Sequence, residues 1–343
     1  MADSSPACYT LGIMDCDNRR LAVKYIRQQA RQLAKQLEGV RAAEDIEYVH
    51  RARVATRRLR ASLAMFGHCF APERVKRWRK VIRRLTGSLG DARDRDVQIE
   101  FLCGALSALS AKECFPGVAH VLVQLEHDRE QLQRQVVKAV DRIDDDGVLR
   151  KIRLVAEEFL DKPSSMPPCL QTPEACQPIK QYVQQQLEEV FQYESSLADP
   201  DDHLRHHAMR IAVKRLRYTL EISRPMCLGR LDAAVETVKR LQALLGDIHD
   251  CDVWLDHLDG FAAEQRDRIV AMFGHPGRFL HLQPGIDHLR NDRHAYRQAT
   301  FEELVRYWAE LKDQRFWDDL ARAVDPAAIG AEAPAEAEQP PSP

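Results

Sequence analysis

Three short blocks of sequence occur twice along this chain, in the same order in each half. The matching segments are residues 53–60 with 210–217, 89–97 with 245–253 and, more weakly, 125–130 with 289–294. Blocks that recur in order at a nearly constant separation indicate a duplicated structural unit. We therefore expect two similar halves that pack about a pseudo-twofold axis.

The apolar spacing within each half predicts helices. Apolar residues recur with a helical period in residues 21–37, 49–66 and 121–140, and the sequence shows no alternating strand pattern with hairpin turns. Glycine and proline mark the expected helix boundaries. We place these boundaries at Gly39, Ala71-Pro72, Gly90, Pro116-Gly117 and Asp144–Gly147. The predicted fold class is all-α, built as duplicated antiparallel helical bundles.

Composition marks the ends of the two halves. A proline-rich stretch near the middle of the chain predicts a linker, and the last residues lack any core-forming pattern. We expect a flexible N-terminus at 1–14, a first helical half at 15–160, the linker at 161–173, a second helical half at 174–323 and a disordered acidic tail at 324–343.

Several classes of protein are excluded by composition. No apolar run approaches the roughly 20 residues that cross a bilayer, and the N-terminus lacks the basic and apolar segments of a signal peptide. The nine cysteines include no CxxC pair, which argues against a disulfide framework and against a zinc ribbon. We therefore expect a cytoplasmic protein with reduced thiols.

The first repeated block carries a high density of positive charge. Residues 51–60 contain five arginines and no acid, in a chain whose formal net charge is only −2. At 100° per residue, four basic positions share one narrow side of a helix, beside an apolar side that can face a core. The second half repeats this stripe. The two stripes are His50, Arg53, Arg57 and Arg60, and His207, Arg210, Lys214 and Arg217.

Such a stripe suits a chain of phosphates. Successive helical turns separate the cations by about 5.4 Å, and arginine can hold phosphate oxygens bidentately without losing its charge. From His50 to Arg84 there are 12 Lys or Arg residues and one acid, Glu73. A single charged helix face is usually solvated surface, but the duplication of this one favours a polyanion site.

The second repeated block supplies carboxylates. Asp94 and Asp250 follow Gly90 and Gly246, where we expect a helix to end. Each carboxylate can therefore cap the following helix. Alternatively, each can pair with an arginine of the stripe and hold it in register.

A metal site is a further alternative. His207, the His249-Asp250 pair and Asp292 loosely follow the H…HD…D ligand order of metal-dependent phosphohydrolases. The first half has Arg93 where the second has His249, and the surrounding arginines would repel a cation. The sequence also lacks a GxxxxGK[ST] loop, a GxSxG elbow and an HExxH helix. We therefore expect no metal, no cofactor and no enzymatic activity.

The paired motifs resemble those of the CHAD domain, the conserved histidine α-helical domain. They are H-x-x-R-x-x-x-R-R-L-R from His50 to Arg60, H-x-x-R-x-x-x-K-R-L-R-Y from His207 to Tyr218, and the two LG-x-x-[RH]-D blocks. The resemblance runs from about residue 15 to 323. It implies an all-helical domain of two similar bundles that binds inorganic polyphosphate on a basic surface or in a channel between the halves.

The resemblance assigns the eight stripe residues to polyphosphate binding and adds cations from other helices. These additions are Lys80, Arg83, Arg84, Lys239 and Arg240 from the third helix of each half, and the row Arg290, Arg293 and Arg297. The third block of the first half has Glu126 and Gln133 where the second has Arg290 and Arg297. This difference predicts a lopsided cationic surface.

One departure from the family concerns its enzymatic partner. Many members follow a triphosphate-processing domain with an ExExK signature, which this sequence lacks. We therefore expect a stand-alone polyphosphate-binding protein that associates with polyphosphate granules. A metal-dependent phosphohydrolase, a nucleic-acid binder and a helical scaffold are the alternatives. Nucleic acid is the less favoured partner, because few aromatic residues lie among the arginines to stack on bases.

Overall fold

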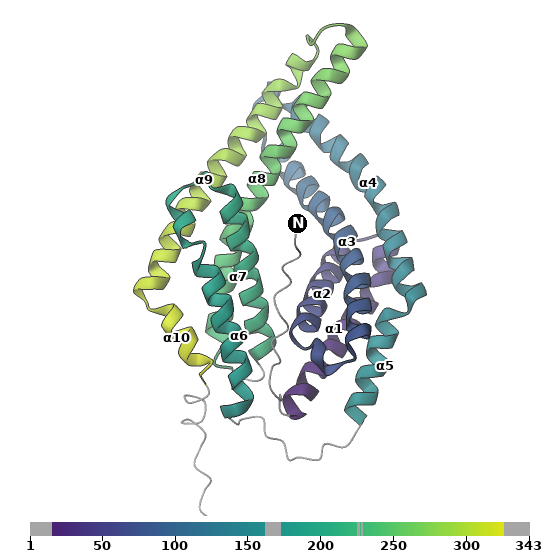
Figure 1. The fold of residues 1–343 in the computed structure, drawn as a ribbon. Coiled ribbons are helices and arrows are strands. Elements are labelled where there is room, and N and C mark those ends of the chain that lie inside the picture. Colours follow the sequence, from purple (N-terminus) through teal and green to yellow (C-terminus); the bar gives the residue numbers. More distant parts are fainter. Residues whose placement is uncertain (1–15, 162–172, 225–226, 228, 326–343) are drawn as a thin grey trace, which may run out of the picture.

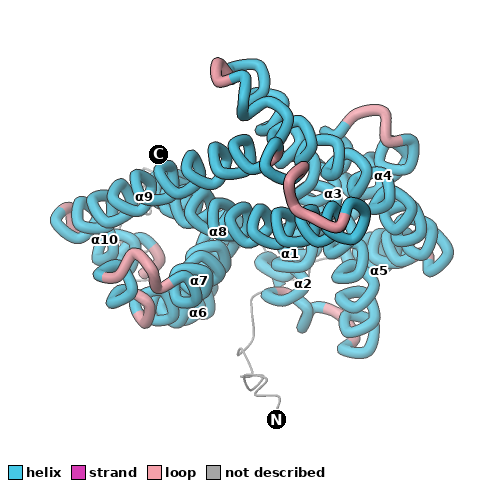
Figure 2. Tube along the Cα trace, turned by 90° about the horizontal axis from the view of Figure 1, so that it is seen from above, coloured by secondary structure: helices cyan, strands magenta, loops and turns pink. Residues whose placement is uncertain are grey.

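The computed structural model describes residues 16–161, 173–224, 227 and 229–325. Within these ranges the chain forms helices, turns and short connections and contains no strand, as the tube in Figure 2 shows. The predicted all-α fold class is confirmed. The predicted flexible N-terminus (1–14), nearly all of the linker (161–173) and nearly all of the acidic tail (324–343) lie outside the described residues.

The first half is a bundle of long helices joined by short connections. They are α1 (Cys16–Ala42), α2 (Ile46–Met65), α3 (Pro72–Ala108), α4 (Phe115–Asp146) and α5 (Val148–Asp161), with the 3-10 turns η1 (Gly67–Cys69) and η2 (Lys112–Cys114). α2 packs against α1 and α3, α4 packs against α3, and α5 returns to α1.

The second half repeats this order of packing. Its helices are α6 (Pro173–Phe191), α7 (His203–Ser223), α8 (Asp232–Phe273), α9 (Gln283–Asp313) and α10 (Phe316–Ala323), with the 3-10 turns η3 (Glu194–Ala198) and η5 (Phe279–His281). α7 packs against α6 and α8, and α9 packs against α8. The repeated blocks therefore lie on equivalent helices, α2 and α7, α3 and α8, and α4 and α9.

The two bundles stand side by side, with α3 and α4 meeting α8 and α9 at one end (Figure 1) and α2 packing against α7. The main apolar core continues through both bundles. A second, smaller core lies at the junction and combines Leu102 and Val121 of the first half with Trp254, Leu258 and Ile286 of the second. None of the described helices has the length and apolar character that spanning a bilayer requires.

Two glycines bring the backbones of the halves into direct contact at this junction. A Cβ atom added to Gly117 would lie 2.2 Å from the carbonyl oxygen of Leu282, and one added to Gly285 would lie 2.2 Å from the carbonyl oxygen of Cys114. Each glycine follows a proline at the start of its helix, α4 or α9. The contact is thus reciprocal and excludes any side chain at either position.

Two of the predicted helix boundaries are wrong. α1 continues past Gly39 to Ala42, and α3 continues through Gly90 to Ala108. Gly90 permits close packing instead of ending the helix, because a Cβ atom there would lie 3.1 Å from Nη1 of Arg53. α8 likewise runs through Gly246. The predicted boundaries at Ala71-Pro72 and Asp144–Gly147 are confirmed, and Gly147 ends α4 with a left-handed φ of 58°.

Candidate anion-binding groove between helices α2, α3 and α7

The basic stripes are positioned by helices whose other faces are buried. α2 begins after Asp45, whose carboxylate accepts a hydrogen bond from the N–H of Glu47, and α7 begins after Asp202, whose carboxylate accepts one from the N–H of Arg205. The buried residues include Val49, Ala52, Leu59 and Leu63 on α2 and Met209, Val213, Leu216 and Leu220 on α7. These apolar faces fix the rotation of each helix, and with it the direction of the stripe.

The stripes of the two halves meet, because α2 and α7 pack against each other across the bundles. Burial lowers the pKa of Arg57 on α2, and the charges of Arg53, Arg217 and Arg210 lower it further. Burial also lowers the pKa of Lys214 on α7 to about 8, with Arg57 and Arg210 as the foremost charges. Cations influence one another in this way only at short separations. The stripe residues of both halves therefore form one cluster.

A pocket of about 1310 Å³ opens beside this cluster. Nine of the side chains that line it are Lys or Arg, and none of the described lining residues is acidic. The nine are Arg57 and Arg60 from α2, Lys76, Arg79, Lys80, Arg83 and Arg84 from α3, and Lys214 and Arg215 from α7. We call this pocket the cationic groove.

Most cations of the groove have no carboxylate partner. Arg215 pairs with Glu189 of α6, but the other eight form neither an ion pair nor a side-chain hydrogen bond within the described part of the chain. Burial lowers the pKa of Arg60, and the charges of Arg83 and Arg79 lower it further across the groove. The fold thus holds like charges together without a counter-charge, which an anion in the groove would supply.

Arg53 and its carboxylate partner Asp94 are not among the residues that line the groove. Nη1 of Arg53 donates to the carbonyl oxygen of Gly90 at 2.7 Å and lies 2.9 Å from Oδ1 of Asp94. The prediction that Asp94 pairs with a stripe arginine is confirmed. The alternative, that Asp94 caps a helix, is wrong because Asp94 lies inside α3.

The remaining stripe cations on α7 also have acidic neighbours. Burial lowers the pKa of Arg210, and the charge of Asp250 opposes that shift. Nε of Arg217 lies 2.9 Å from Oε1 of Glu221, and Glu221 reaches Arg58 of α2 at 3.8 Å. Arg210 and Arg217 therefore belong to the cluster but carry less uncompensated charge than the groove cations.

The predicted cations on α8 lie outside the groove. Lys239 pairs with Glu236 at 3.1 Å, and Arg240 pairs with Glu303 at 3.2 Å. The guanidinium of Arg240 also stacks over the ring of Tyr307, 4.2 Å from its centroid. The equivalent cations on α3, by contrast, line the groove without partners.

The arginine row on α9 is also paired. Arg290 binds Asp259 and Asp287, and Arg293 binds Asp292 and stacks over Phe101. Arg297 is buried, with Nε 2.6 Å from Oδ1 of Asp252 and Nη1 donating to the carbonyl oxygen of Pro200. This row holds α9 against its neighbours. The cations without a carboxylate partner among the described residues lie mainly in the first half. The third repeated block had suggested the second half, because it has Arg290 and Arg297 there.

The two stripe histidines are poorly suited to carry charge. Burial lowers the pKa of His50, and the nearby charge of Arg93 lowers it further. Burial also lowers the pKa of His207, next to Arg210. Nδ1 of His207 lies 3.1 Å from Nδ1 of His249, whose pKa falls to about 4 through burial and the charge of Arg210. These rings are neutral near pH 7.

The residues considered for a metal site do not form one. No group of three or more His, Cys, Asp or Glu side chains among the described residues is arranged to hold a metal ion. Asp292 binds Arg293 instead. The His207–His249 pair lies beside the guanidinium of Arg210, which would repel a cation.

The sequence-based site missed some groove residues. Lys76 and Arg79 line the groove from α3, and Arg215 lines it from α7. Positions 76, 79, 80, 83 and 84 fall on one helix face by their spacing, opposite a buried face that contains Trp78 and Ile82. Extending the helical-face argument from α2 to α3 would have identified Lys76 and Arg79.

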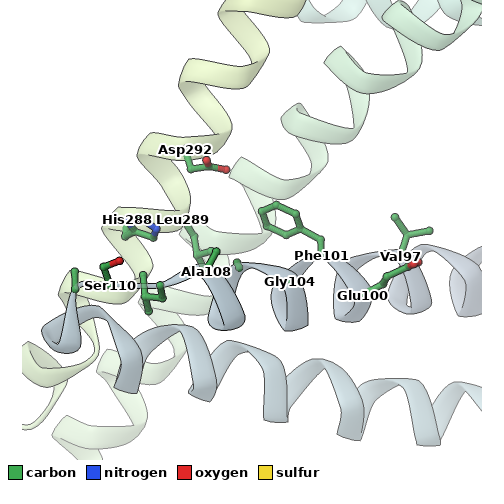
Figure 3. Close-up of a pocket in the computed structure, with 12 residues that line it drawn as sticks. Val97, Glu100, Phe101, Gly104, Ala108, Ser110, His288, Leu289 and Asp292 are labelled. Atoms are coloured by element: carbon green, nitrogen blue, oxygen red, sulfur yellow. The ribbon is translucent and has the colours of Figure 1, made fainter.

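A second pocket, of about 870 Å³, lies where α3 passes α9 and differs in character from the groove. Figure 3 shows Val97, Phe101 and Ala108 along α3, with Leu289 of α9 next to Ala108. The charged side chains that line it are acidic, Glu100 and Asp292. This pocket is therefore unsuited to a polyanion, and the cationic groove is the candidate site.

A family model described as the CHAD domain matches residues 24–259, more than half of the chain. The chain belongs to the CHAD domain family. The resemblance inferred from the motifs is confirmed. All nine groove cations lie within the matched CHAD segment, whereas the α9 row lies beyond it.

Two solved structures share the fold of this CHAD domain. The crystal structure of the CHAD domain from the plant Ricinus communis is 21% identical, with a TM-score of 0.55, and the alignment covers 85% of this chain and 98% of that one. PptA from Streptomyces chartreusis is 16% identical, with a TM-score of 0.56, and the alignment covers 85% and 99%. No curated protein matches the sequence significantly.

Proposed function

We propose that the cationic groove binds inorganic polyphosphate and that this protein acts by binding, not by catalysis. Membership of the CHAD domain family supports a polyphosphate-related role. The observation that carries the proposal is the set of eight Lys and Arg side chains around one groove that have no carboxylate partner among the described residues. A linear polyanion offers one negative charge after another to such a set.

The geometry of the walls supports a linear ligand. The α3 cations are exposed and recur on successive turns about 5.4 Å apart, while Arg57 and Lys214 lie half-buried at the contact between the halves. Arginine contributes bidentate hydrogen bonds to phosphate oxygens, and lysine contributes a compact charge. Several phosphates are then neutralised together, and the release of counterions makes the affinity depend steeply on salt.

The predicted site residues fall into three groups under this proposal. The first group contacts the phosphates and consists of Arg57, Arg60, Lys80, Arg83, Arg84 and Lys214. Lys76 and Arg79, which the sequence-based site did not include, belong to the same group. The half-buried residues Arg53, Arg210 and Arg217 do not line the groove and act on these cations through their charge. The third group contributes only to the overall electrostatic potential and consists of Lys239, Arg240, Arg290, Arg293 and Arg297. The side chains of His50 and His207 add little positive charge near pH 7.

The test is a titration of labelled long-chain polyphosphate against two variants of equal charge. The groove variant changes four exposed residues of the α3 wall, Lys76, Arg79, Lys80 and Arg83, to Gln. The control variant changes four exposed cations elsewhere, Lys112, Lys239, Arg240 and Arg268, to Gln. We expect the groove variant to lose more than about ten-fold in affinity, and its salt slope to fall by roughly one for each phosphate contact removed.

The control variant should bind within about two-fold of the wild type, since its charges are distant and screened at moderate salt. Equal losses in the two variants would show that only overall charge matters and would refute the groove. Circular dichroism establishes that both variants keep their helices. DNA and RNA added as competitors at the same salt test the nucleic-acid alternative, which requires them to displace polyphosphate efficiently.

We further propose that this binding brings the protein to polyphosphate granules in the cytoplasm. The same pair of variants, carrying a fluorescent label in cells that store polyphosphate, separates groove binding from general charge. Granule association that survives in the groove variant would contradict this localisation.

A further inference from the structure

Lys214 differs from the other lysines of the groove in its surroundings. Its amino group is half-buried on α7 at the contact with α2, and it makes no hydrogen bond or ion pair within the described residues. Lys76 and Lys80, on the α3 wall, are exposed. The guanidinium groups of Arg57 and Arg210 are the foremost charges acting on Lys214. Its cationic form is thus disfavoured by both burial and repulsion.

The charged and titratable groups near Lys214 come from the helices that meet at the groove. They are Arg53, Arg57 and Arg60 from α2, Lys80 and Arg84 from α3, Arg210 and His207 from α7, and His249 from α8. With a pKa of about 8 in place of 10.5, the amine of Lys214 is neutral far more often near pH 7 to 8 than that of an ordinary lysine. A neutral amine is a nucleophile.

The positive charge around Lys214 determines which kind of electrophile its amine would react with to give a stable product. A Schiff base with a carbonyl compound would restore a cation among the arginines, and acylation would give a neutral product. Addition of carbon dioxide gives an anion, which adjacent guanidinium groups stabilise through charge-assisted hydrogen bonds. We propose that Lys214 is a site of reversible carbamylation by carbon dioxide, with the carbamate held by the arginines of the cluster.

The reaction balances without any further reagent. The lone pair of the neutral Lys214 Nζ forms a bond to the carbon of CO₂, and one C=O electron pair moves onto oxygen. An N–H proton then leaves to water, and the product is an N-carboxylate with a charge of −1. Loss of CO₂ after reprotonation of nitrogen reverses each step.

The modification opposes ligand binding, and this consequence rests on the proposed function. A carbamate places a negative charge in the groove and occupies the guanidinium groups that would hold phosphates. Bound phosphates in turn favour the protonated amine, which cannot attack CO₂. The two states of the groove therefore exclude each other, and CO₂ acts as a competitor of polyphosphate.

The test is carbon-13 NMR of the full chain in buffer equilibrated with ¹³C-bicarbonate near pH 8. We expect a carbamate resonance, besides that of the chain's α-amine, which Lys214→Arg reduces by more than about ten-fold, because that change keeps the charge and removes the nucleophile. The matched control, Lys239→Arg, alters an exposed lysine on α8 and should leave the resonance unchanged. Arg57→Gln keeps the lysine but removes a stabilising guanidinium, so it should weaken the resonance.

Each outcome is decisive. A wild-type spectrum without the resonance, or one that survives in Lys214→Arg, overturns the modification. Adding long-chain polyphosphate to the wild type should remove the resonance. If polyphosphate binds and the resonance persists, the competition is wrong although the modification stands. If polyphosphate does not bind, the proposed function fails, and the carbamate is judged on the spectra without polyphosphate.

Discussion

Arg53 and Arg57 lie one turn apart on α2 but differ in how their guanidinium groups are satisfied. Arg53 donates to the carbonyl oxygen of Gly90 and pairs with Asp94. Nε of Arg57 is buried without a hydrogen-bond partner among the described atoms. An unsatisfied charged donor destabilises the folded state, and such a cost is typical of residues retained for function.

Replacing Arg57 tests this difference. We expect Arg57→Met, which keeps an unbranched apolar stem and removes the guanidinium charge, to raise the free energy of unfolding by roughly 1 kcal/mol in the absence of an anion. The same variant should bind polyphosphate more weakly. Urea unfolding measures the first effect, with Arg53→Met as the comparison, which should destabilise because it leaves the Gly90 contact unmade. A destabilised Arg57→Met would contradict the interpretation of Arg57 as an uncompensated cation.

The lowered pKa of Lys214 predicts how binding depends on pH. The pKa is about 8 in the free protein, and bound phosphates must raise it because they favour the cation. Binding therefore takes up a proton, so the affinity is greatest below pH 8 and falls as pH rises through 8, by at most about ten-fold per pH unit. His50 and His207 do not interfere, since their pKa values are lowered away from this range.

Polyphosphate titrations between about pH 6.5 and about pH 9.5, in buffers purged of CO₂ and at constant salt, measure this dependence. Lys214→Arg should flatten the profile, because arginine keeps its charge throughout. A profile that is equally steep in Lys214→Arg would assign the titration to another group.

At the scale of elements, the glycines show what sequence alone could decide. The boundaries predicted at Pro116-Gly117 and Asp144–Gly147 coincide with the start and the end of α4, because proline and glycine each have a local conformational preference. Gly90 looked the same in the sequence, yet α3 continues through it. Its role depends on the guanidinium of Arg53, which comes from another helix, and local sequence carries no information about that approach.

The contact between the starts of α4 and α9 makes a quantitative prediction. Gly117→Ala should destabilise the protein by roughly 2 kcal/mol or more, because the new methyl group would overlap the carbonyl oxygen of Leu282 and force the helices apart. The control is Gly260→Ala in α8, where a Cβ atom meets nothing within 4 Å. Alanine there should stabilise by up to about 1 kcal/mol through helix propensity.

Urea unfolding of the two variants provides the comparison. Opposite signs are expected for the two changes. If Gly117→Ala were as well tolerated as Gly260→Ala, the backbones of the halves could not be as close as the reciprocal contact requires.

At the scale of the whole molecule, the helical class could be predicted from the sequence, because it depends on the periodicity of apolar residues. The duplication of the halves and their pseudo-twofold relation stay predictions. The sequence did not reveal which cations are free. Lys239-Arg240 and Arg83-Arg84 look alike in the sequence, but Glu303 reaches Arg240 from α9. Pairing of this kind is set by packing between distant segments.

The exposed α3 wall has a consequence for stoichiometry. Its cations are exposed to solvent along several turns, so an internal stretch of a polymer could bind in the groove without a chain end having to enter first. The number of protein molecules bound to one polyphosphate would then increase with the length of the polyphosphate, not with the number of its ends. Under the proposed function, one long polyphosphate would bind many copies of the protein along its length, each copy covering its own stretch.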